Sequence, residues 1–129
     1  MAERRVIVTR AARIWLDDDD IIHSHCLPNI EQTIADAEET TAAFWEIAGH
    51  RRLPVLVDLR RARAIDRLAR NHYAGPEGAR VQCAVGLLVG SPLSRMVGNV
   101  FLGFNNTIIP VRLFTVEAEA LAWLRGFRA

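Results

Sequence analysis

The densest group of side chains able to bind a ligand is a run of arginines in the middle of the chain. They are Arg60, Arg61, Arg63, Arg67 and Arg70. Guanidinium groups form forked hydrogen bonds with carboxylates and phosphates, so these arginines are candidate binding residues for an acidic partner or a phosphate ligand. The alternative is a solvated basic helix face that pairs with acidic residues elsewhere. No aromatic side chains are interleaved with the arginines to stack on bases, so nucleic acid is not an expected partner.

A second group lies in the segment His23-Ser24-His25-Cys26. On a strand, His23 and His25 would lie on one face and Cys26 on the other. Two imidazoles on one face could fill two positions around a metal ion. Candidates for a third ligand are Asp17 to Asp20, His50 and His72. Half-buried strand residues beside a turn are the simpler interpretation, so the sequence predicts neither a metal site nor a cofactor.

Catalytic patterns are weak. Asp58 ends an apolar stretch, a common position for a ligand-binding residue, but a lone aspartate more often caps a turn or pairs with a nearby arginine. Asp58, His72 and Tyr73 would be the first residues to test for activity. The serines lie outside any nucleophile-elbow motif, and the glycines lack phosphate-binding spacing. We therefore predict no catalytic residues and no enzymatic activity.

The elements that must position these residues can be predicted from apolar spacing. Residues 6–26 alternate at period two, with Asp17 to Asp20 as a turn, which predicts two or three antiparallel strands. Residues 30–48 repeat at three and four, which predicts a helix capped by Asn29 and ended by Gly49.

Strands and helices then alternate. Strands are predicted at 53–59, 81–90 and 110–114, and the first of these runs lacks alternation, as is typical of a strand covered on both faces. Helical spacing follows each run, at 65–73, 92–105 and 115–127, with Thr115 as the expected cap of the last helix. Arg63, Arg67 and Arg70 would share one face of the first of these three helices. Such alternation predicts parallel strand pairing with helices outside the sheet.

The helix at 92–105 is apolar on most sides, and Ser91-Pro92 gives it a good start. The residues of its main face that we consider a candidate interface or apolar pocket are Met96, Val97, Val100, Phe101 and Phe104. A helix of this kind must be covered on more than one side. Neighbouring loops, a dimer interface or an apolar ligand could cover it, and Gly98 would permit the close backbone approach of a dimer.

Composition predicts a single domain over residues 1–129. Half of the residues are hydrophobic, yet no apolar run reaches the roughly 18 residues of a membrane span. Two cysteines without CxxC spacing and a charged N-terminus without a signal peptide indicate a reduced, cytoplasmic protein. Residues 14–50 carry acids and no arginine, whereas the basic residues concentrate after residue 50. The two halves could pair with each other, or form a docking surface for a charged partner.

Three stretches resemble the STAS domains of sulfate transporters and anti-sigma-factor antagonists: LPVLVDLR at 53–60, AVGLLVGSPLSRMVGNVFLGFN at 84–105 and PVRLFTVEAEALAWL at 110–124. In detail the chain is similar to small bacterial STAS-like proteins of unknown function that are grouped with lipid-binding-type domains. The resemblance implies an α/β fold: a mixed sheet of about five or six strands with four helices packed against it.

Anti-sigma-factor antagonists of this fold carry a phosphorylatable serine or threonine just after a central strand. Residues 59–65 of this chain contain no hydroxyl group, so the resemblance does not extend to that switch. The function that we expect is a non-enzymatic regulatory or protein-binding module, homodimeric, with an unknown protein partner. The alternative is a carrier or sensor of a small apolar or acyl ligand.

Overall fold

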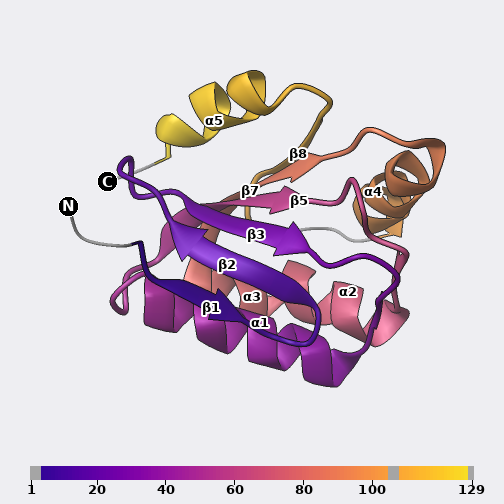
Figure 1. Ribbon diagram of the computed structural model, residues 1–129, viewed down its shortest axis with the longest axis horizontal. Coiled ribbons are helices and arrows are strands. Elements are labelled where there is room, and N and C mark those ends of the chain that lie inside the picture. Colours follow the sequence, from indigo (N-terminus) through magenta and orange to yellow (C-terminus); the bar gives the residue numbers. More distant parts are fainter. Residues whose placement is uncertain (1–3, 105–107, 128–129) are drawn as a thin grey trace.

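The protein is described by a computed structural model that covers residues 4–104 and 108–127, with side chains for residues 4–99 and 108–127. Six strands form the main sheet, in the spatial order in which they follow one another along the chain (Figure 1). They are β1 (Val6–Val8), β2 (Ala12–Leu16), β3 (Ile22–Cys26), β5 (Leu53–Asp58), β7 (Gln82–Leu88) and β8 (Val111–Phe114). The first three pair antiparallel, and β3, β5, β7 and β8 pair parallel. The predicted mixed sheet is confirmed.

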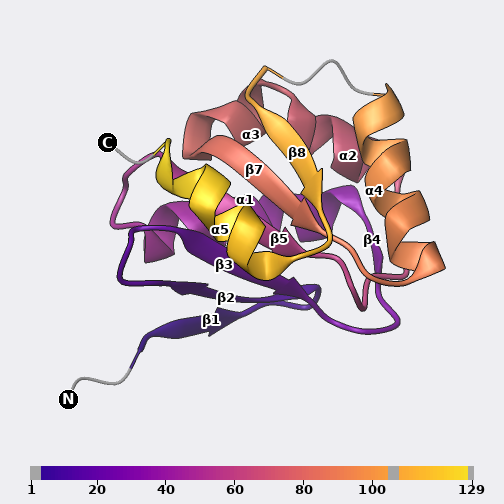
Figure 2. The same cartoon turned by 90° about the horizontal axis from the view of Figure 1, so that it is seen from above.

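Helices cover both faces of this sheet. They are α1 (Ile34–Ile47), α2 (Arg67–Ala74), α3 (Pro76–Val81), α4 (Pro92–Phe104) and α5 (Glu117–Arg125). Figures 1 and 2 show α1, α2 and α3 on one face and α5 on the other. The sequence predicts four helices, and α3 is an addition. Because α3 has only six residues, it is too short to show helical periodicity, and Pro76 begins it rather than ending the pattern before it.

Two helices begin later than their apolar patterns predict. Glu31–Gln32 form a short strand, β4, which pairs with β6 (Ala64–Ile65). Thr33 is then the N-cap of α1, and Asn29 instead adopts a left-handed backbone with φ of 62°. Gly49 has φ of 65° and ends α1 as predicted.

The start of α2 also differs from the prediction. Asp66 caps this helix, since its carboxylate accepts a 2.9 Å hydrogen bond from the Ala69 N–H. Arg63 therefore lies before the helix and cannot share a helix face with Arg67 and Arg70. The last helix, α5, has Val116 as its N-cap rather than Thr115.

The helix α4 begins as expected, because the Ser91 hydroxyl accepts a 3.0 Å hydrogen bond from the Ser94 N–H. Val97 is 8% exposed and belongs to the core, whereas Met96 is 57% exposed. A Cβ atom on Gly98 would lie 2.6 Å from Leu113 Cδ1. The close approach that Gly98 permits is therefore between α4 and its own sheet, and the expectation that it serves a dimer is wrong. The predicted contacts of Val100, Phe101 and Phe104 fall outside the described side chains.

Strand register decides which residues share a face of the sheet. His23 lies opposite Leu56, and His25 lies opposite Asp58. Leu56 packs in the core cluster that includes α5 residue Leu124. Because side chains alternate along a strand, both histidines and Asp58 lie on the α5 face, and Ser24 lies on the face toward α1.

The helix α5 packs on β5, β7 and β8, and Figure 2 shows that it does not extend over β1. The antiparallel part of this face is accordingly accessible, and Val8 is 65% exposed there. The two halves of the chain do exchange ion pairs, since Arg51 contacts Asp20 at 3.1 Å and Arg125 contacts Asp19 at 2.9 Å. Within the described residues, no helix is long and apolar enough to cross a membrane.

Candidate functional site

A groove of about 630 Å³ opens where β3 and β5 end. It is lined by Arg13, His25, Cys26, Leu27, Pro28, Asp58, Arg60 and Arg61. The carboxyl ends of parallel strands are the usual ligand-binding edge of an open α/β sheet. This groove is therefore the first candidate site.

A forked ion pair between Asp58 and Arg60 is part of the groove lining. The Arg60 Nε donates to Asp58 Oδ1 at 3.0 Å and its Nη2 donates to Oδ2 at 2.7 Å, while the backbone N–H of Arg60 also donates to Oδ1 at 3.0 Å. Burial alone would raise the pKa of Asp58, but the hydrogen bonds and charge of Arg60 outweigh it and lower the pKa below its ordinary value. Asp58 is thus an ionised carboxylate that is held by Arg60.

This ion pair predicts an acid-dependent part of the stability. A carboxyl whose folded pKa is depressed contributes stability above its unfolded pKa, and that contribution is lost as pH falls through the folded pKa. At neutral pH, Asp58→Asn should lower the free energy of unfolding by about 1 to 2 kcal/mol. The difference between variant and wild type should shrink progressively below about pH 5. Urea unfolding followed by circular dichroism at several pH values measures both quantities.

The control for this prediction is Asp18→Asn, which neutralises an exposed carboxylate of the β2–β3 turn. Its stability should follow that of the wild type across the same pH range. A constant difference between Asp58→Asn and wild type at all pH values would contradict the assignment.

The five arginines that are candidate binding residues do not converge. Arg60 and Arg61 line the groove, whereas Arg63 and Arg67 are exposed elsewhere. Arg70 donates a 2.6 Å hydrogen bond to the carbonyl of Ile65, which gives it a structural role. Arg13 joins the groove instead, because β2 pairs with β3 and brings it opposite His25. No local signal in the sequence marks Arg13.

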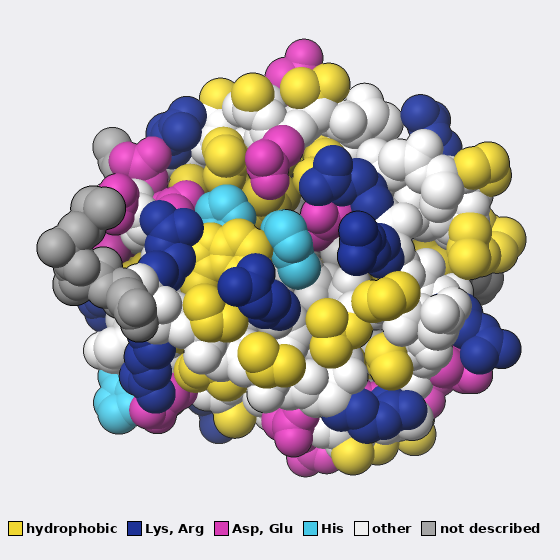
Figure 3. Space-filling model, viewed as in Figure 1, with side chains coloured by type: hydrophobic (Ala, Val, Ile, Leu, Met, Phe, Trp, Pro, Cys, Tyr) yellow, Lys and Arg dark blue, Asp and Glu magenta, His cyan; other side chains and the backbone are white. Residues whose placement is uncertain are grey.

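The two histidines of β3 form a second cluster, which adjoins the groove because His25 also lines it. The His23 Nε2 lies 2.8 Å from Asp17 Oδ2, and the Trp15 ring stacks on His23 with a centroid distance of 5.1 Å. The possible metal-ligand atoms of His23, His25 and Glu117 all lie within 4.8 Å of one another. Figure 3 shows histidines in the middle of this face, with acidic and arginine side chains around them. Sequence reasoning missed Glu117, which is distant along the chain.

A family model described as Domain of unknown function (DUF7793) matches residues 14–128. This chain belongs to that family. It is also similar to the crystal structure of an uncharacterized protein from Shewanella loihica PV-4, of the DUF3478 family with a SpoIIAA-like fold. That protein is 18% identical, with a TM-score of 0.59, and the match covers 96% of this chain and 97% of the other. The similarity shows the fold, so the predicted STAS-like architecture is confirmed.

A further solved protein of unknown function, from Arthrobacter sp. FB24, is 34% identical to this DUF7793 chain. The match covers 92% of this chain and 95% of the other, with a TM-score of 0.31. A comparison with curated proteins found no match.

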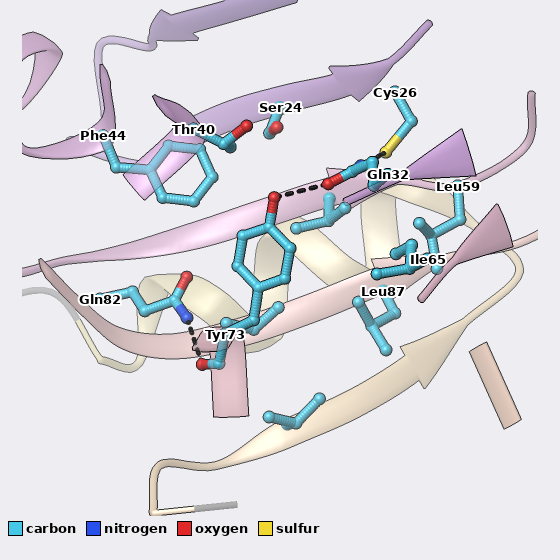
Figure 4. A pocket seen from close by; sticks show the side chains of 13 residues that line it. Ser24, Cys26, Gln32, Thr40, Phe44, Leu59, Ile65, Tyr73, Gln82 and Leu87 are labelled. Carbon is cyan, nitrogen blue, oxygen red and sulfur yellow. Dashed lines mark hydrogen bonds between the residues drawn. The ribbon is translucent and has the colours of Figure 1, made fainter. Parts of the chain in front are cut away.

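The DUF7793 domain also contains a small internal cavity between the sheet and the helices α1 and α2 (Figure 4). Tyr73 donates a 2.7 Å hydrogen bond to Gln32 Oε1 there, and Gln32 Nε2 donates to Cys26 Sγ at 3.6 Å. Burial raises the pKa of Cys26 to about 12, and burial also raises the pKa of Tyr73. Both groups therefore stay protonated at neutral pH.

The internal cavity has a volume of about 30 Å³, which is room for one or two water molecules. None of the described residues of α4 lines it. Tyr73 reaches this cavity while Asp58 lies at the groove, and His72 contacts the hydroxyl of Thr41 at 2.9 Å. The three residues singled out for a test of activity thus have separate surroundings.

Proposed function

We propose that this protein is a non-enzymatic regulatory module whose groove binds an acidic segment of a protein partner. One observation carries the proposal: Arg13 and Arg61 face a groove whose one carboxylate, Asp58, is already neutralised by Arg60. The groove therefore has an excess of positive charge. Guanidinium groups with exposed donors favour partners that present carboxylates.

The chemistry of the groove supports a binding role rather than catalysis. Cys26 is the thiol at the groove, and its pKa of about 12 keeps it protonated and a poor nucleophile. Asp58 has its carboxylate oxygens engaged by Arg60, so it is a poor general base. These states support a surface that recognises a partner without transforming it.

The STAS-like fold supports the regulatory part of the proposal. Because residues 59–65 contain no hydroxyl group, we expect the partner to bind without a phosphorylation switch at this loop. Cys26 and Cys83 are both free thiols, which agrees with a reducing compartment such as the cytoplasm. Homodimerisation remains a prediction, and Leu93 and Met96, exposed by 45% and 57%, are the described apolar residues of α4 that support it.

The alternative function, a carrier or sensor of an apolar or acyl ligand, has weaker support. The internal cavity of about 30 Å³ is far smaller than the several hundred Å³ of a typical small-molecule pocket. A ligand would have to displace core side chains such as Phe44 and Tyr73. We therefore favour the groove over the cavity as the functional site.

The proposal can be tested with a fluorescein-labelled peptide of ten residues that contains several glutamates, with a glutamine version as the uncharged probe. The wild-type protein should bind the acidic peptide and not the glutamine peptide. The double variant Arg13→Ala/Arg61→Ala should weaken binding about tenfold, because it removes two partly exposed charge contacts. Fluorescence anisotropy at physiological salt measures the affinities.

The matched control is Arg67→Ala/Arg80→Ala, which removes the same charge from exposed positions on α2 and α3. It should bind the acidic peptide like the wild type. Equal losses in both double variants would indicate attraction by net charge alone and would contradict the groove. So would a wild-type protein that binds neither peptide.

A further inference from the structure

We propose that His23, His25 and Glu117 form a binding site for a divalent transition-metal ion of the zinc type. Their possible ligand atoms lie within 4.8 Å of one another, although β3 and α5 are far apart in the sequence. Imidazole nitrogen together with one carboxylate is a common ligand set for zinc. The site adjoins the groove, because His25 also lines it, but its three proposed ligands are not the arginines proposed to contact an acidic partner.

The buried nitrogen of His23 is the strongest reason for the proposal. The His23 side chain is 91% buried, since its relative exposure is 9%. Its Nε2 contacts the carboxylate of Asp17, and its Nδ1 is buried with no hydrogen-bond partner among the described residues. Buried polar atoms are rarely left without a partner, because the loss of water is then uncompensated. A metal ion at Nδ1 would satisfy this atom.

Asp17 holds the His23 ring in an orientation that suits metal binding at Nδ1. When Asp17 accepts a hydrogen bond from Nε2–H, the proton of the neutral ring is on Nε2 and the lone pair is on Nδ1. A carboxylate behind a histidine is the arrangement that commonly orients metal-binding imidazoles. Asp17 itself is held by its backbone contacts, because its Oδ1 accepts from the N–H groups of Asp19 and Ile21 at 2.8 and 3.0 Å.

His25 lies two residues further along β3, on the same face of the sheet, and has similar surroundings. Its Nε2 is also buried without a hydrogen-bond partner in the described part of the chain, and it lies 3.7 Å from Asp58 Oδ2. A small rotation of the ring would complete a hydrogen bond to Asp58, as His23 makes to Asp17. A histidine ring held in this way by a carboxylate can bind a metal ion through its other nitrogen.

Glu117 completes the set from the first turn of α5. Ligand atoms around tetrahedral zinc lie about 3.3 Å apart, given bonds of about 2.0 Å. The possible ligand atoms here lie within 4.8 Å of one another, which is a wider limit than this spacing. Because the Glu117 side chain is exposed, a change of its rotamer can bring its carboxylate closer to the histidines. Trp15 packs against the cluster, since its ring stacks on His23 and meets His25 edge-on with a centroid distance of 4.5 Å. A bound ion would thus connect the start of α5 to β3 and leave a fourth position open.

The experiment uses Co²⁺ as a spectroscopic probe and the full chain, freed of metal with a chelator. We expect one Co²⁺ per chain, with visible absorption bands of a four- or five-coordinate site that added Zn²⁺ removes. Fluorescence of Trp15 should be quenched on binding, and Trp15→Phe should lose that part of the quenching. His25→Ala should abolish binding, and Glu117→Gln should weaken it at least tenfold. Asp17→Asn should weaken it about 10- to 100-fold.

Two matched controls isolate the site. His50→Ala removes an exposed histidine that stacks on Trp45, and Glu119→Gln neutralises an exposed acid of the same helix as Glu117. Both should bind Co²⁺ like the wild type. Circular dichroism establishes whether each variant is folded. If His25→Ala does not fold, Co²⁺ binding by Glu117→Gln tests the proposal. Absence of Co²⁺ uptake by the wild type, or uptake unchanged in both His25→Ala and Glu117→Gln, would overturn the proposal.

Discussion

Replacing Phe44 with alanine should lower the free energy of unfolding by about 3 to 5 kcal/mol. Phe44 is 1% exposed on the inner side of α1 and packs in the core cluster with Ile14, Ile22 and Val55. It also lines the internal cavity. Removal of the ring would therefore enlarge this cavity. Because the surrounding side chains cannot easily fill the larger space, we expect the loss of unfolding free energy to lie toward the upper end of this range.

The neighbouring residue provides the control. Trp45 is 36% exposed and stacks on His50 at the surface, so Trp45→Ala should cost less than about 1 kcal/mol. Urea unfolding followed by circular dichroism at one pH compares the two variants. Similar losses for both would mean that α1 does not face the sheet with Phe44.

The substitution Gly78→Ala should destabilise the fold by about 3 kcal/mol or more, despite the small size of the added methyl group. A Cβ atom at residue 78 would overlap the Tyr73 carbonyl oxygen and lie 2.6 Å from its carbonyl carbon. These are backbone atoms, and they cannot move without opening the connection between α2 and α3. The same carbonyl accepts a 3.1 Å hydrogen bond from Gln82, which would be lost.

Gly126→Ala is the matched substitution for this test. Gly126 has φ of −69°, and a Cβ atom there would come no closer than 3.3 Å to the Trp123 carbonyl oxygen. Its effect should stay within about 0.5 kcal/mol of the wild type. Thermal unfolding of the three proteins measures the difference, and a Gly78→Ala protein as stable as the wild type would show that α2 and α3 meet less closely.

Most of the sheet could be predicted from the sequence, because the residue patterns that indicate its strands and turns involve only neighbouring residues. The Asp17 to Asp20 turn, the buried runs and the Ser91 cap are all properties of adjacent residues. The starts of α1 and α2 could not be predicted in this way. The apolar spacing continues through Glu31–Gln32 and Ile65, but those residues pair as β4 and β6, so tertiary pairing overrides the helical pattern.

The candidate site was harder to predict than the fold. His23 and His25 were recognisable, because strand alternation alone places them on one face. Arg13 and Glu117 were not, since each reaches the site through the order of strands and the docking of α5. The arginine run was hard to interpret for a related reason. A dense cluster in the sequence suggests one binding surface, but the chain passes from β5 through β6 to α2 over these residues, so the arginines lie on different parts of the surface.

The two outer strands also bear on how molecules of this protein meet one another. β1 has three residues and β8 has four, with Pro110 directly before β8 and the exposed Arg112 within it. Proline, charge and shortness each discourage a neighbouring molecule from extending the sheet by edge-to-edge hydrogen bonding. The fold is thereby protected against open-ended growth into fibres, and contacts between copies are left to the side chains of its faces.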